Sequence, residues 1–192
     1  MHDKPAGAGR SSFDLIDAAC LFRELALFQG VTFLDVGCGA GEYTIRVARV
    51  VGPGGTVYGV DPWAEGIERL RERAVAEGLS NVRATVSDAS KSLPFDAASV
   101  DRCLLATVLH DLKREGVAEG ALSEITRVLK PGGRLVVVEF EKIDGPPGPP
   151  KAIRLSPEET AAMVEPHGLS AGPTVNLGPY AYLIVFRKPA HG

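Results

Sequence analysis

The chain has 192 residues, of which 45% are hydrophobic and 23% are charged, and its formal net charge is −3. This length suits one well-cored domain, which we expect to span residues 13–192 behind a disordered tail of residues 1–12. The acidic balance argues against a general electrostatic grip on nucleic acid or on an anionic membrane, and it leaves room for a local basic patch.

The cysteines and the apolar runs indicate the compartment. Cys20, Cys38 and Cys103 are scattered and odd in number, a pattern typical of reduced thiols without a zinc site. The N-terminus lacks the apolar core of a signal peptide, and no apolar run approaches the ~20 residues that span a bilayer. We therefore expect a soluble, cytoplasmic protein.

The first two thirds of the chain alternate between helical and strand patterns. Residues 14–28 place apolar side chains on one helical face, and Gly30 interrupts this pattern. We expect buried strands at 31–37, 56–61, 81–88, 102–109 and 134–140, and helices at 41–51, 64–78 and 116–129, the last closed by a turn at 130–133. Apolar strands that alternate with helices predict an α/β fold with a doubly wound, mostly parallel sheet covered on both faces.

The last third of the chain has a different pattern. The prolines of residues 144–150 exclude a helix or a central strand there, so we expect a loop. Residues 156–168 predict a helix, with Ser156 as N-cap and Pro157 at the first helical position. Two further strands, 173–178 and 180–188, are close enough in sequence to form an antiparallel hairpin.

A glycine-rich loop lies between the first strand and the second helix, in the stretch FLDVGCGAGEY. Three alternating glycines permit close backbone approach to a ligand, and the N–H groups of the helix start can receive an anion. A dinucleotide fingerprint needs glycine at position 42, where this chain has Glu42, and no G-K-[ST] follows for a P-loop. A tight structural turn is the alternative to a ligand site.

The pattern around this loop resembles motif I of the class I S-adenosylmethionine-dependent methyltransferases. Asp61 ends the second strand, Asp88 ends the third, and the runs SLPFDAASVD and RVLKPGGRLVVVEF resemble later segments of the same family. The resemblance covers roughly residues 31–140 and is nearest in kind to the type 11, ubiquinone/menaquinone-biosynthesis-like group. It implies a seven-stranded, Rossmann-like sheet whose C-terminal hairpin supplies the antiparallel seventh strand.

The resemblance also implies a role for particular residues. Asp35 faces the ammonium group of the cofactor, directly or through water, Asp61 takes the ribose, and Asp88 takes the adenine. Asp61 is alternatively or additionally a helix cap, Asp88 is alternatively a turn residue, and Trp63 is alternatively packing at a helix start. The full set of expected cofactor-binding residues is Asp35, Gly37, Cys38, Gly39, Gly41, Asp61, Pro62, Trp63, Asp88, Ala89, Ala106 and Thr107, and no metal is expected.

His110 is the candidate catalytic residue, because histidine titrates near neutral pH and can remove a proton from an acceptor. A structural histidine is the alternative. Asp111 can orient His110 only if the backbone turns between them. We expect the N-terminal helix and the loop 144–150 to form the walls of the acceptor site.

The expected function is transfer of a methyl group from S-adenosylmethionine to an unidentified small molecule, by a monomer or homodimer without nucleic-acid or membrane partners. One alternative is a non-catalytic S-adenosylmethionine-binding sensor or scaffold. The other is a protein or nucleic-acid methyltransferase, which the acidic charge and the lack of an N/D-P-P-[YF] tetrapeptide disfavour.

Overall fold

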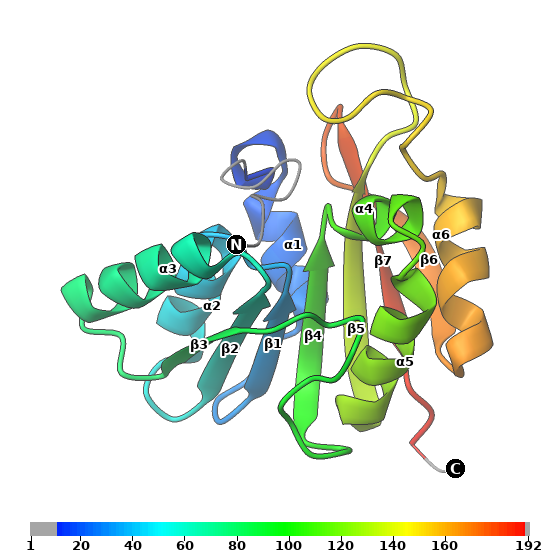
Figure 1. The fold of residues 1–192 in the computed structure, drawn as a ribbon. Helices are drawn as coiled ribbons and strands as arrows, with labels where there is room; N and C mark the ends of the chain where they lie inside the picture. The colour runs from blue at the N-terminus through cyan, green and yellow to red at the C-terminus, as the bar shows by residue number, and fades with distance from the viewer. Residues whose placement is uncertain (1–10, 191–192) are drawn as a thin grey trace.

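In the computed structural model, which describes residues 11–190, the strands form one seven-stranded sheet in the order β3-β2-β1-β4-β5-β7-β6 (Figure 1). Strands β1 to β5 pair in parallel, whereas β7 pairs antiparallel with both β5 and β6. The strands are β1 Thr32–Val36, β2 Thr56–Asp61, β3 Val82–Val86, β4 Val100–Ala106, β5 Leu129–Phe140, β6 Ser170–Asn176 and β7 Ala181–Arg187. This topology confirms the predicted fold class.

Helices cover both faces of the sheet (Figure 1). They are α1 Ala18–Leu25, α2 Glu42–Val51, α3 Ala64–Ala76, α4 Leu109–Arg114, α5 Ala118–Val128 and α6 Pro157–Val164. Apolar residues of α1 and α2 share one core cluster with β1, β4, β5 and β7, while residues of α4, α5 and α6 form the cluster on the opposite face. Ser156 caps α6 as predicted, in a capping box with Glu159.

The N-terminal helix is shorter than the sequence pattern predicts. The segment begins with a 3-10 turn, Phe13–Leu15, and α1 starts only at Ala18. The break arises because Asp17 is extended: its N–H donates to the carbonyl of Leu177, and its carboxylate accepts from the N–H of Cys20 as a helix cap. The helix ends at Leu25, since Ala26 adopts the left-handed conformation.

The end of β4 and the start of β5 also differ from the sequence expectation. The strand expected over 102–109 ends at Ala106, and the unpredicted helix α4 follows. Thr107, with φ of 55°, makes the turn between them. The turn expected at 130–133 is a bulge inside β5, because Val100 pairs with Leu129 while Arg102 pairs with Arg134.

The expected tail of residues 1–12 falls mostly outside the described residues. Ser11 and Ser12 are described, and Ser12 is only 4% exposed. Within residues 11–190, no helix has both the length and the apolar character needed to cross a bilayer.

Candidate active site

A cavity of about 980 Å³ opens at the carboxyl ends of the parallel strands. This edge is where ligands bind in open α/β sheets. The proline-rich loop 144–150 and residues of α4 complete the walls. Of the residues expected from the sequence, the cavity is lined by Gly37, Gly39, Asp61, Pro62, Asp88, Ala89, Ala106, Thr107 and His110. Asp35, Cys38, Gly41 and Trp63 are not among the lining residues.

The glycine loop needs its glycines for two different reasons. Gly41 has φ of 81°, and a Cβ there would lie 2.2 Å from Cδ1 of Leu70, so the residue allows α3 to pack against the loop. Gly39 has φ of 53°, but a Cβ built on it meets nothing within 4 Å. Because Gly39 also lines the cavity, its backbone leaves open space that a ligand can approach closely.

Asp61 connects the end of β2 to this loop. Its Oδ2 accepts from the N–H of Gly39 at 2.9 Å, and its Oδ1 accepts from the N–H of Trp63 at 2.8 Å. Burial raises the pKa of Asp61, and the two N–H donors act against that rise. The residue in the N-cap position of α3 is Trp63, so Asp61 stabilises the turn before the helix and does not serve as its N-cap.

Trp63 and Asp88 occupy contrasting environments. Trp63 is 5% exposed, and a Cβ on Gly66 would lie 2.3 Å from its ring, so the indole is packed at the start of α3. Asp88 has a side chain 41% exposed, and its Oδ1 accepts from the N–H and the hydroxyl of Ser90. These bonds to Ser90 are the main reason that the pKa of Asp88 is lowered.

Asp35 lies behind the glycine loop, at the end of β1. It is 1% exposed and accepts a hydrogen bond of 2.6 Å from the hydroxyl of Thr44. Burial raises its pKa to about 7, with a smaller rise from the nearby charge of Asp61 and a partial offset from Thr44. The carboxyl is therefore poised to change charge near neutral pH.

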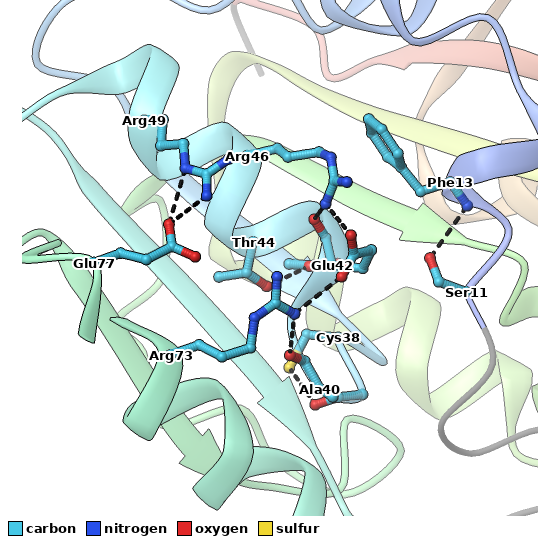
Figure 2. A network of polar contacts seen from close by, with 12 residues as sticks. Ser11, Phe13, Cys38, Ala40, Glu42, Thr44, Arg46, Arg49, Arg73 and Glu77 are labelled. Carbon is cyan, nitrogen blue, oxygen red and sulfur yellow. Dashed lines mark hydrogen bonds and ion pairs between the residues drawn. The ribbon is translucent and has the colours of Figure 1, made fainter. Parts of the chain in front are cut away.

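An ionic network fixes the outer side of the same loop (Figure 2). Glu42, whose presence in place of a third glycine disfavours a dinucleotide site, is bound by Arg46 and by Arg73. Figure 2 shows that Arg73 reaches the loop. Its guanidinium also donates to the carbonyl of Ala40 at 3.1 Å. Since Arg73 belongs to α3, this contact ties that helix to the glycine loop.

His110 is 4% exposed and lies near the start of α4. Its ring Nδ1 is 2.7 Å from Oε2 of Glu139, and its backbone N–H donates to Oε1 of the same carboxylate at 3.1 Å. Its Nε2 is 3.6 Å from Oδ2 of Asp111, so the helical turn brings the two neighbours together. Burial alone would lower the pKa of His110, but the bond to Glu139 and the charges of Glu139 and Asp111 outweigh it, and the pKa is raised.

Sequence reasoning missed Glu139 and Ser12 at this site. Glu139 is fully buried next to the end of β5, and the signal for it was a single carboxylate in an otherwise apolar strand pattern. Ser12 lines the cavity, with its hydroxyl 2.8 Å from that of Tyr43 and 3.2 Å from that of Thr107. Nothing in the small, polar N-terminal sequence signals this contact.

The proline-rich loop contributes to the cavity wall, as expected, through residues 146–150. A third missed residue, Arg154, holds it. This side chain is 1% exposed and donates to the carbonyls of Glu141, Gly145, Pro147 and Pro149. On the opposite side of the cavity, Ser11, Ser12 and Leu15 form the wall, so the segment before α1 takes the place expected for the helix itself.

Comparison with known proteins agrees with this geometry. Residues 27–170 match the family described as "Methyltransferase domain". A S-adenosylmethionine (SAM)-dependent methyltransferase structure from Aquifex aeolicus superposes with a TM-score of 0.84 and 29% identity, covering 96% of this chain and 94% of that one.

Two relatives have quinones in their names. The ubiquinone/menaquinone biosynthesis C-methyltransferase UbiE of Stutzerimonas stutzeri is 38% identical over 59% of this chain and 43% of its own length. The 2-phytyl-1,4-naphtoquinone methyltransferase of Nostoc punctiforme is 35% identical over 62% of this chain and 50% of its own length. The matched region therefore spans about half the length of these relatives. The chain belongs to the methyltransferase-domain family of S-adenosylmethionine-dependent enzymes, and part of it is similar to UbiE.

Proposed function

We propose that this protein transfers a methyl group from S-adenosylmethionine to a small-molecule acceptor by in-line displacement. One observation carries the proposal: the glycine loop, Asp61, Asp88 and His110 come from separate parts of the chain and line a single cavity. Holding two reactants in line within such a site can lower the activation barrier by roughly 7–11 kcal/mol.

The lining residues fit the cofactor. Gly39 leaves open space at the loop, where the methionine part can approach the backbone. Each oxygen of Asp61 accepts one N–H, and a carboxylate has capacity for about four hydrogen bonds, so it can also accept from ribose hydroxyls. Asp88 is partly exposed at the next strand end, and we assign it to the adenine amino group. When bound, the cofactor supplies a methyl group on a sulfonium, which requires no metal.

The expected site residues that do not line the cavity take supporting roles in this proposal. Cys38, Gly41 and Trp63 shape the loop and the start of α3 from behind. Asp35 acts through its charge: a cationic ligand at the loop favours the ionised carboxylate, whose pKa of about 7 lets binding shift its protonation. Ala106, Thr107, Pro62 and Ala89 supply packing surface around the cofactor.

His110 is the proposed proton acceptor. Glu139 holds Nδ1, and both His110 and Asp111 line the cavity. Nε2 is therefore the ring nitrogen that can take a proton from the molecule being methylated. The apolar walls, including Phe140 and the four prolines within residues 146–150, exclude water from the reacting atoms. A neutral O–H or N–H acceptor would give its proton to His110 as the methyl group arrives.

The acceptor is proposed to be a small organic molecule rather than a macromolecule. The cavity is at the upper end of the size range of small-molecule sites, ~1,000 Å³, and therefore has room for an acceptor beside the cofactor. Because two relatives have quinones in their names, quinone-type rings are the first compounds to test. We further propose a single cytoplasmic domain acting as a monomer or homodimer.

Calorimetry with S-adenosylhomocysteine tests the cofactor site. We expect binding by the wild type and at least about tenfold weaker binding by Asp61→Asn, with exposed Asp96→Asn as the control that removes one charge outside the cavity. Transfer of radiolabelled methyl groups to fractionated lysate then separates small-molecule from macromolecular acceptors. Cofactor binding without transfer to any fraction would favour the sensor or scaffold role, and equal binding by Asp61→Asn and wild type would contradict the assigned site.

A further inference from the structure

Three arginines form a row across adjacent strands, away from the cavity. In the sheet register Arg102 of β4 pairs with Arg134 of β5, and Arg134 pairs with Arg187 of β7. Register partners on neighbouring strands project from the same face. The adjacent row toward the cavity, Leu104, Val136 and Val185, belongs to the core under α1 and α2, so the arginine row lies on that face.

Little on the described chain neutralises this arginine row. Arg102 donates to the carbonyls of Leu25 and Asp101. Within residues 11–190, the side chains of Arg134 and Arg187 make no hydrogen bond or ion pair with the protein, and both residues pair only through their backbones in the sheet. The acidic groups that face the row are Asp101, which binds Lys130 and the N–H of Thr32, and Glu24, which pairs with Arg23.

The arrangement carries an energetic cost. Like charges directly opposite each other destabilise a sheet, and here this occurs at two successive strand pairs. Partial burial lowers the pKa of Arg102 and of Arg134, and the neighbouring arginines lower both further. Departures from local rules of this kind are expected where a site serves a ligand.

We propose that the arginine row is a binding site for linked phosphate groups, separate from the methyl-transfer cavity. The planar fork of each guanidinium matches phosphate oxygens in pairs. Neighbouring strands lie about 4.8 Å apart, so the row extends about 10 Å, and two linked phosphates can bridge adjacent arginines. A single carboxylate would neutralise only one member. The acidic overall composition is compatible with a local basic patch, and the arginine row is such a patch. The phosphate groups of the ligand come either from a soluble compound or from a lipid headgroup.

Thermal unfolding of the full chain with inorganic pyrophosphate, at constant ionic strength, tests the soluble source. We expect the wild-type Tm to rise by about 3 °C when the free ligand exceeds its Kd about tenfold. Arg134→Gln/Arg187→Gln should lose this rise, while Arg69→Gln/Arg83→Gln, which removes equal charge on α3 and β3, should keep it. Without ligand, the first variant should be at least as stable as wild type, because repulsion is relieved. The single variant Arg187→Gln, at an exposed position, gives the same comparison if the double variant folds poorly.

Sedimentation with vesicles of phosphatidylcholine, with and without cardiolipin, tests the lipid source, because cardiolipin carries two phosphates joined through glycerol. Binding that requires cardiolipin and is lost in Arg134→Gln/Arg187→Gln, but not in the control, supports the site with a lipid as its ligand. The proposal is overturned by an equal pyrophosphate response in both double variants. It is also overturned if the wild type responds to neither pyrophosphate nor anionic vesicles.

Discussion

Glu139 holds His110 at two points, accepting its backbone N–H at Oε1 and lying 2.7 Å from ring Nδ1 at Oε2. Glu139 is fully buried in β5, and His110 lies in α4, so the pair joins two elements from different parts of the chain. Burying a carboxylate costs free energy unless hydrogen-bonding partners compensate it. His110 supplies two such partners, its backbone N–H and its ring Nδ1. The pair therefore fixes which ring nitrogen serves the cavity.

Replacing Glu139 with glutamine should change the pH dependence of activity. Because the pKa of His110 is raised, the histidine is protonated below that pKa, and a proton acceptor must be neutral, so activity should rise as pH passes through it. Glu139→Gln removes the carboxylate charge and lowers this pKa, so the acidic limb should move to lower pH. The maximal rate should fall about 10- to 100-fold.

The measurement is a pH profile of kcat/KM, with the His110 ring signal titrated by NMR in parallel. Glu141→Gln removes a nearby carboxylate whose side chain does not bind His110, and its profile should match wild type. An unmoved profile in Glu139→Gln, with a lower rate alone, would mean that Glu139 is merely structural.

The sequence was sufficient for features that depend on local pattern. Alternating apolar strands and helices predicted the sheet, and the positions of Asp61 and Asp88 at successive strand ends predicted that both meet at one edge. The roles of Ser12 and Arg154 depend on contacts between distant segments, which no local pattern encodes. Glu139 left only a single carboxylate in an apolar strand pattern, and its partner His110 lies far away in the sequence. The short helix α4 was missed because the apolar run of β4 continues into it, and only the positive φ of Thr107 separates the two.

Gly39→Ala should weaken cofactor binding more than it weakens the fold. Its φ of 53° strains any residue with a Cβ, at a cost of about 1–2 kcal/mol, and the added methyl group enters open space beside the cavity. Gly132→Ala is a matched control, since Gly132 has φ of 75° and also meets nothing within 4 Å, but does not line the cavity. Both variants should lose similar Tm, while only Gly39→Ala loses affinity for S-adenosylhomocysteine by calorimetry. Equal affinities would exclude close approach of the ligand at Gly39.

Asp35 should make stability fall as pH rises. Its pKa is about 7 in the folded protein and 3.8 as a model group, so the folded state holds a proton that the unfolded state releases between these values. The free energy of unfolding should therefore decline between about pH 4 and 7, by an amount of order 4 kcal/mol. Asp35→Asn cannot ionise and should lack this decline.

Urea unfolding of the wild type and Asp35→Asn at pH 5 and pH 8 measures the effect as a difference, so that other titrating groups cancel. The asparagine variant should gain relative stability at pH 8. Exposed Asp96→Asn should show no such gain. If the two proteins share one pH dependence, the burial of the Asp35 carboxyl does not control its ionisation.

Arg154 should control the shape of the acceptor wall without touching the cofactor. Its guanidinium binds the carbonyls of Glu141, Gly145, Pro147 and Pro149, so Arg154→Met leaves these partly buried acceptors without that donor and should cost at least about 2 kcal/mol. Arg154→Lys keeps the charge but cannot reproduce the planar fork, and it should lose part of the same stability. Because the loop supplies cavity residues 146–150, the KM for the acceptor should rise in both variants.

Limited trypsin digestion at Lys142 and Lys151, which flank the loop, reports its release directly, and calorimetry reports the cofactor site. Faster cleavage with unchanged cofactor affinity is the expected result for Arg154→Lys. Asp144→Asn breaks only an exposed ion pair with Lys151 and should change neither cleavage nor KM by much. If Arg154→Lys weakens cofactor and acceptor binding equally, the arginine supports the whole fold, and the loop is not a separate wall. A selective loss of acceptor binding would instead mean that one buried cation, hydrogen-bonded to backbone carbonyls and lying over the Phe140 ring, sets the acceptor site independently of the cofactor site.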